Sequence, residues 1–120
     1  MTRTWDIRLP YTRPPLSLND RMHWATKARL TKEIRAYVRE ACTYRVPDLT
    51  RAHVVLHWVP RDRRRRDTDN PFPTLKAAID GIRDAGVVPD DSSEYVTSAV
   101  VLDPPQPKDP HVYLVIEERT

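Results

Sequence analysis

Residues 52–59, with the sequence AHVVLHWV, restrict the possible folds of this chain more than any other segment. The pattern predicts a β-strand with apolar side chains on both faces. Val54 and Leu56 lie on one face, and Val55 and Val59 lie on the other. Since an edge strand or a half-exposed strand would show apolar residues on one face only, we expect a central strand of a sheet.

The remaining elements are predicted by the spacing of apolar residues and by proline. Alternating side chains predict strands at residues 4–9, 94–102 and 111–117. Apolar residues at helical spacing predict helices at 24–44 and 73–85. The order strand, helix, strand, helix, strand, strand predicts one α+β domain, residues 1–120, with a four-stranded mixed or antiparallel sheet and both helices on one side.

Several single residues carry structural expectations. His57 lies inside the predicted central strand, where we expect a packed, hydrogen-bonded side chain. Cys42 is the only cysteine, and we expect it to be buried in the first helix. Gly81 inside the second helix is expected to permit close packing, and Gly86 is expected to adopt a left-handed conformation after that helix. Pro73 is the expected first helical residue.

The charge is distributed unevenly along the chain. There are 20 Lys and Arg against 17 Asp and Glu, a formal net charge of +3, and the positive charge is concentrated in residues 21–66. This asymmetry favours an anionic partner on one face, although a solvated basic surface would show the same pattern. The single cysteine, the lack of an apolar run near the ~20 residues of a membrane span, and an N-terminus without a signal-peptide core predict a cytoplasmic protein without a membrane partner.

Residues 61–91, RDRRRRDTDNPFPTLKAAIDGIRDAGVVPDD, combine a basic run with two acidic pairs. Asp67 and Asp69 are two residues apart, and extended backbone would place both carboxylates on one face. Two carboxylates held close together repel each other unless a cation lies between them. Carboxylate oxygens suit Mg²⁺, with Mn²⁺ as a substitute, and the four histidines are too scattered to favour zinc.

The second acidic pair, Asp90 and Asp91, follows the second predicted helix. If the fold brings the two loops together, the metal ligands are Asp67, Asp69, Asp91 and Asp90. Such a site would polarise a phosphodiester and activate a water molecule, and Lys76 would stabilise the charge that develops on the phosphate. The competing interpretation is a surface of salt bridges between arginines and aspartates.

At these residues the sequence resembles the RusA family of Holliday junction resolvases. The similar features are the basic run Arg63–Arg66, Asp67-Thr68-Asp69-Asn70, Lys76, Ala85-Gly86, Asp90-Asp91, and an N-terminal loop with Leu9-Pro10, Pro14-Pro15 and Asn19. The resemblance implies a homodimeric, Mg²⁺-dependent endonuclease that introduces paired nicks into four-way DNA junctions in recombination and repair. It is a family frequent in phages and prophages.

The resemblance also implies the residues of the site. Asp67, Asp69, Asp91 and Lys76 would be catalytic. The DNA would be bound by Arg63, Arg64, Arg65, Arg66, Asn70, Lys27, Arg29 and Arg21. A homodimer suits a four-way junction, because the two scissile strands are related by two-fold symmetry.

One departure from the family pattern lies before Lys76. Six residues separate Asp69 from Lys76, where three are usual in the family. Three residues are close to one helical turn, so whether Lys76 faces the carboxylates stays open. Two other functions also stay open. One is non-catalytic DNA binding on the same scaffold, and the other is RNA binding, for which Trp24 and Tyr37 are the aromatic cue, although both are expected to pack or to lie at helix edges.

Overall fold

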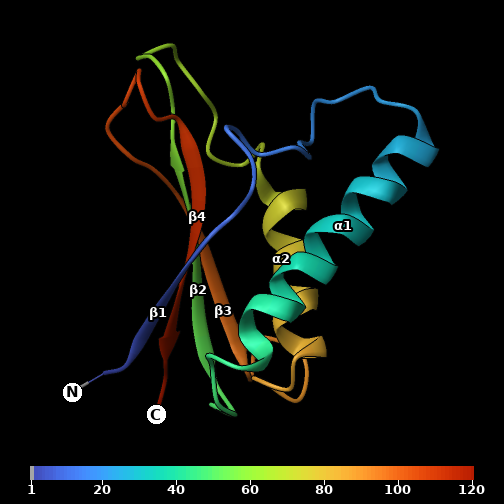
Figure 1. Cartoon of the computed structure of the whole chain (residues 1–120), viewed down its shortest axis with the longest axis vertical. Helices are drawn as coiled ribbons and strands as arrows, with labels where there is room; N and C mark the ends of the chain where they lie inside the picture. Colours follow the sequence, from blue (N-terminus) through green and yellow to red (C-terminus); the bar gives the residue numbers. More distant parts are fainter. Residues whose placement is uncertain (1) are drawn as a thin grey trace.

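The computed structural model describes residues 2–120 and shows a mixed sheet with both helices packed against one of its faces (Figure 1). The elements are β1 (Thr4–Arg8), α1 (Trp24–Thr43), β2 (Ala52–Val59), α2 (Phe72–Asp84), β3 (Val96–Leu102) and β4 (His111–Glu118). This is the predicted order, and the predicted bounds differ from the observed ones by at most two residues. No helix within residues 2–120 is long and apolar enough to cross a membrane.

The strand order in the sheet is β1-β4-β2-β3. The central position of β2 is confirmed, because it pairs with β4 in antiparallel orientation and with β3 in parallel orientation. Parallel neighbours need a crossover connection, and here α2 provides it. The polar segment 61–71 therefore leaves the carboxyl end of β2, and the segment 85–95 enters the amino end of β3.

The core lies between the helices and the sheet. Its fully buried large side chains are Ile7, Ile34, Val38, Val54, Leu56, Leu75, Ile82, Val87, Val88, Val112, Leu114 and Ile116. Cys42 is also fully buried, as predicted, and burial raises the pKa of its thiol to about 11. Tyr37 shares the helical spacing of Ile34, Val38 and Ala41, which predicts the apolar face of α1, but it is 40% exposed and its hydroxyl donates a hydrogen bond to the Arg8 carbonyl over 3.1 Å.

The two glycines have the roles that their positions predict. A Cβ atom on Gly81 would lie 2.5 Å from the Arg35 carbonyl oxygen and 3.0 Å from the Val38 Cβ. Only glycine therefore allows α1 and α2 to approach this closely. Gly86 follows α2 with φ of +83°, in the left-handed region. The same helix pair is joined by Arg35, whose Nη2 donates to Asp84 Oδ1 over 2.9 Å.

Helix α2 begins one residue earlier than expected. Its first residue is Phe72, so Pro73 is the second helical residue rather than the first. The reason is a turn directly before the helix, in which the Phe72 amide donates to the Asp69 carbonyl over 3.2 Å. Pro71 is the N-cap and has no side-chain hydrogen bond to the helix.

The proline-rich segment 10–20 is fixed to α2 by one buried threonine. Thr74 is fully buried, and its hydroxyl donates to the Leu16 carbonyl over 2.8 Å. The same hydroxyl oxygen accepts a hydrogen bond from the Leu16 amide over 3.0 Å. Because both backbone groups of Leu16 bond this side chain, Thr74 anchors the loop at Leu16, and the Leu18 amide, which donates to the Asn70 carbonyl over 3.0 Å, anchors it again two residues later.

His57 is a hydrogen-bonded, half-buried residue, as predicted. Its Nδ1 lies 3.1 Å from both carboxylate oxygens of Asp103, and its ring stacks on Tyr113 at a centroid distance of 4.6 Å. These contacts lie on the sheet face opposite the helices. The contacts of His57 therefore explain its presence in the strand by a structural role, without a ligand.

Candidate functional site

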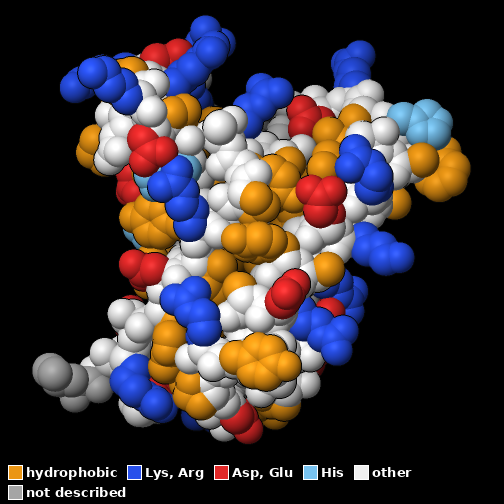
Figure 2. All heavy atoms as spheres, in the orientation of Figure 1, with side chains coloured by type: hydrophobic (Ala, Val, Ile, Leu, Met, Phe, Trp, Pro, Cys, Tyr) orange, Lys and Arg blue, Asp and Glu red, His pale blue; other side chains and the backbone are white. Residues whose placement is uncertain are grey.

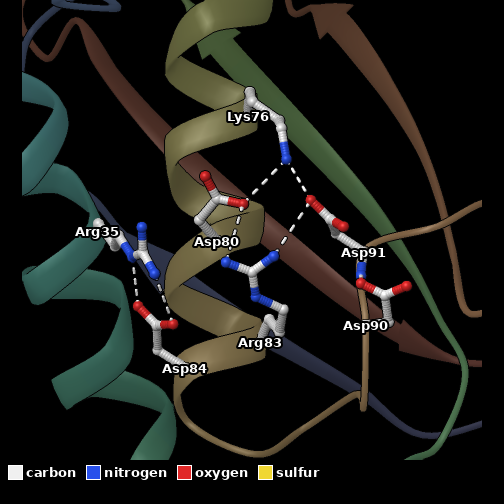
Figure 3. Close-up of polar contacts among 7 residues, drawn as sticks. All are labelled: Arg35, Lys76, Asp80, Arg83, Asp84, Asp90 and Asp91. Carbon is white, nitrogen blue, oxygen red and sulfur yellow. Dashed lines mark hydrogen bonds and ion pairs between the residues drawn. The ribbon is translucent and has the colours of Figure 1, made fainter.

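Helix α2 positions the lysine of the predicted site. Its apolar face buries Leu75, Ala78 and Ile82 in the core. Lys76 and Asp80 are displaced from that face and project toward the loop that follows the helix (Figure 3). The amphipathic spacing thus fixes the direction of the lysine, and packing against the sheet fixes its position.

Lys76 lies between two carboxylates. Its Nζ donates to Asp80 Oδ1 over 2.9 Å and also to Asp91 Oδ2. Arg83 approaches the same two acids, with Nη1 at 3.5 Å from Asp91 Oδ2 and Nη2 at 3.8 Å from Asp80 Oδ1 (Figure 3). The structure therefore brings Lys76 together with Asp91, the second member of the second acidic pair. An ammonium group has three donors, so one N–H of Lys76 remains for a further acceptor.

The contact between Lys76 and Asp91 changes the acidity of both groups. The hydrogen bond from Lys76 is the main reason why the pKa of Asp91 falls to about 2. The same hydrogen bond raises the pKa of Lys76. Both side chains therefore carry their charges throughout the neutral pH range.

Asp67 and Asp69 lie in the turn that precedes α2. Asp67 Oδ1 accepts a hydrogen bond from the Asp69 amide over 3.0 Å, and the Asp67 carbonyl accepts one from the Asn70 amide over 3.2 Å. The expected extended backbone is therefore absent here, because a side chain that bonds the amide two residues ahead closes a turn. Both carboxylates are exposed to solvent.

The turn gives the two aspartates different surroundings. Asp67 lies in the wall of a groove of about 840 Å³ between the proline-rich segment and the arginine run. Arg13, Arg65 and Asn70 line the same groove. Asp69 lines a separate hollow of about 440 Å³ together with Phe72. A spacing of two residues thus does not place these carboxylates on one face here.

The four predicted metal ligands form two groups in this structure. Asp67 and Asp69 share the turn before α2. Asp90 and Asp91 follow the helix, and Asp90 Oδ1 accepts a hydrogen bond from the Asp91 amide over 2.8 Å. Within residues 2–120, no three His, Cys, Asp or Glu side chains are grouped as metal ligands would be.

The arginine run, residues 61–66, is organised by an acid that the sequence analysis did not single out. Asp62 Oδ1 accepts hydrogen bonds from Arg66 Nη2 over 2.7 Å and from the Arg64 amide over 3.0 Å. The guanidinium of Arg66 also lies 5.1 Å from the ring centroid of Trp58, a cation–π geometry. The signal that could have found Asp62 is its position two residues before the Arg64 amide, the spacing of an Asx turn.

These contacts divide the predicted DNA-binding arginines into two kinds. The Arg66 side chain is 14% exposed and holds the loop together. Arg63, Arg64 and Arg65 are exposed and free to contact a partner. The other predicted DNA contacts, Arg21, Lys27 and Arg29, are exposed at and near the beginning of α1, and Arg29 Nη1 lies 3.4 Å from Glu33 Oε2.

Figure 2 shows the result on the surface. Lys and Arg side chains gather at one end of the molecule, over the arginine run, and again near the N-terminal end of α1. The groove that contains Asp67 lies between the segments that carry them. Comparison of the sequence with models of known protein families and with curated proteins finds no match.

Proposed function

We propose that this chain is a metal-dependent endonuclease for branched DNA, as its resemblance to the RusA family implies. The observation that carries the proposal is the groove of about 840 Å³ whose wall contains Asp67 beside Arg65 and Arg13. Exposed guanidinium groups attract a phosphate backbone, and an exposed carboxylate in the same wall is the kind of ligand that a hard cation needs there.

The chemistry of the donors fits Mg²⁺ or Mn²⁺. Because the two acidic pairs are separate in this structure, a single ion bound to both pairs would require their loops to approach each other. Asp67 and Asp69 offer exposed carboxylate oxygens, and Asp91 and Asp90 offer further oxygens after α2. When bound, such a cation polarises the phosphodiester and lowers the pKa of a coordinated water. The absence of nitrogen and sulfur donors from the motif is typical of a site for a hard ion.

The chain's own side chains have three tasks in this proposal. Arg63, Arg64 and Arg65 bind the phosphate backbone. Lys76, held against Asp91, presents its remaining N–H to a phosphate oxygen as negative charge develops on it. Packing of α2 against the sheet keeps that lysine in place, so that little reorganisation is needed during the reaction.

We further propose that the active species is a homodimer acting on four-way junctions in DNA recombination and repair. A four-way junction has two scissile strands related by two-fold symmetry. A dimer with the same symmetry presents two equivalent sites to them. The single chain described here would then supply one site of each pair.

The direct test is cleavage of a synthetic four-way junction. With Mg²⁺ or Mn²⁺ we expect paired nicks near the branch point, and we expect no nicks when EDTA removes the metal. Light scattering on the same sample establishes whether the protein is a dimer. A folded dimer that leaves the junction intact in both metals would refute the proposal.

Neutralising the exposed arginines is expected to weaken binding to every DNA sequence. The double variant Arg63→Gln, Arg65→Gln removes two phosphate contacts. The plot of the logarithm of the DNA-binding constant against the logarithm of the salt concentration has a negative slope, and the steepness of that slope should decrease by about 1.8. The matched control is Arg3→Gln, Arg51→Gln, which makes the same charge change at the opposite end of the sheet, because Arg3 and Arg51 directly precede β1 and β2, whereas the arginine run follows β2. Titration of labelled duplexes at several salt concentrations measures both slopes, and equal slopes for the two double variants would contradict the assignment.

A second candidate is a structure-selective DNA-binding protein without catalysis. The ion pairs of Asp91 with Lys76 and Arg83 favour it, because they occupy a carboxylate that the endonuclease needs. This candidate predicts junction binding that is indifferent to metal, and no nicking. Competition of the junction against structured RNA distinguishes both candidates from an RNA-binding protein.

A further inference from the structure

The most exposed tryptophan of the chain lies outside the hydrophobic core, and its ring is near the His23 ring, at a centroid distance of 5.5 Å. Trp24 is the first residue of α1 and is 76% exposed, so of the two expected positions, packed or at a helix edge, it has the second. Its backbone is nevertheless fixed, because His23 caps the helix by accepting a hydrogen bond from the Ala25 amide at Nδ1 over 3.2 Å. A large aromatic ring is thus held in solvent by a rigid element.

The surroundings of Trp24 are positively charged. Between Arg21 and Lys32 the sequence contains four basic residues and no acidic one. A groove of about 620 Å³ follows this part of α1, and it is lined by Trp24, Lys27, Ala28, Thr31, Lys32 and Arg35. These positions share one helical face, since they recur at intervals of three and four residues.

The charges within this groove are not equivalent. Arg35, at its far end, is bound to Asp84 on α2. Lys27 and Lys32 are exposed, and they lie between that ion pair and the indole. A rise of 1.5 Å per residue separates Trp24 from Lys32 by about 12 Å along the helix, the length of about three to four stacked nucleotides.

We infer that Trp24 is a stacking platform for an unpaired nucleobase, with Lys27 and Lys32 binding the phosphates of the same strand. The inference rests on the proposed function in requiring a nucleic-acid partner. A base inside a duplex has both faces covered by its neighbours, whereas an unpaired base offers a free face to an aromatic ring. The lysines favour a polyanion over an apolar protein surface as the partner. This surface would therefore select strands that are open, such as those at a branch point.

The test compares binding of Trp24→Ala to a labelled oligothymidylate and to a duplex of equal length. We expect at least about a 5-fold loss on the single strand, the lower end of the usual contribution of one stacked base, and less than a 2-fold change on the duplex. Trp24→Phe should retain most of the affinity. Tyr44→Ala is the matched control, because Tyr44 is 92% exposed at the other end of α1.

Salt and abasic strands separate stacking from charge. Trp24→Ala should leave the salt slope unchanged, since an indole is uncharged, whereas Lys27→Gln with Lys32→Gln should lower the slope on the single strand by about 1.4. On an oligonucleotide without bases, wild type and Trp24→Ala should bind equally. An unequal result there, or an equal loss on duplex and single strand, would overturn the stacking assignment.

The outcomes also separate this inference from the proposed function. If the wild-type protein nicks or binds junctions but Trp24→Ala binds single strands as Tyr44→Ala does, only the stacking assignment is wrong. If the wild-type protein binds neither junctions nor single strands, both proposals are wrong. Because Trp24 is exposed, its replacement is expected to leave the fold intact, which circular dichroism checks.

Discussion

Replacing Asp67 or Asp69 with asparagine is expected to reduce Mg²⁺-dependent nicking of a four-way junction by at least about 100-fold. Asparagine keeps the size of the side chain but removes the negative charge that a divalent cation needs. In Asp67→Asn the side-chain oxygen can still accept the hydrogen bond from the Asp69 amide, so the turn before α2 is preserved. Single-turnover cleavage of a labelled junction measures the effect.

Binding to the junction should survive in both variants. The arginine run is unchanged, and loss of a negative charge beside a phosphate backbone does not weaken the attraction. Glu94→Gln is the matched control, because it removes one exposed carboxylate outside the motif and should nick at the wild-type rate. Wild-type nicking by both asparagine variants would rule out these two carboxylates as the metal ligands.

Replacing Thr74 with valine is expected to lower the free energy of unfolding by about 2–4 kcal/mol. Valine fills the same space but has no hydroxyl, so the buried amide and carbonyl of Leu16 both lose their partner. Each unsatisfied buried group costs about 1–3 kcal/mol. Urea denaturation measures the change, and the variant should also nick more slowly, since the released segment forms one wall of the groove that contains Asp67.

Thr43→Val is the control for this substitution. The hydroxyl of Thr43 donates to the Arg39 carbonyl over 2.7 Å, but Thr43 is exposed and water can replace the bond. We expect the free energy of unfolding of Thr43→Val to differ from that of the wild type by less than about 0.5 kcal/mol. Equal effects of the two substitutions would show that Thr74 does not hold the proline-rich segment in place.

The positions of the helices and strands could be predicted because each depends on a local pattern. Alternation of apolar residues identified the strands, and apolar side chains on both faces identified β2 as central. Gly81 indicated the close approach of α1 and α2, because glycine destabilises a helix and its presence there suggests that no side chain would fit. These signals are local because side-chain direction follows the backbone period.

The arrangement of the candidate site could be predicted only in part. Lys76 and Asp91 are 15 residues apart, and the structure brings them into contact. The turn at Asp67 and the role of Asp62 were missed, because a side chain that bonds a nearby amide leaves no periodic trace in the sequence. In both places the side chain of an aspartate accepts a hydrogen bond from the backbone amide two residues later. An aspartate in a loop, with this spacing to a free amide, is the signal that could have been used.

The sequence by itself determined which elements form, which faces of them are apolar, and where charge accumulates along the chain, because these depend on neighbouring residues. Only the tertiary structure determined which residues each charged or aromatic side chain contacts. Thr74 holds Leu16 across 58 positions of sequence, Lys76 lies against Asp91, and Trp24 lies outside the core with its ring tilted against His23. Such contacts depend on how helices and loops dock on the sheet, and docking is set by the packing of the whole core rather than by any local pattern.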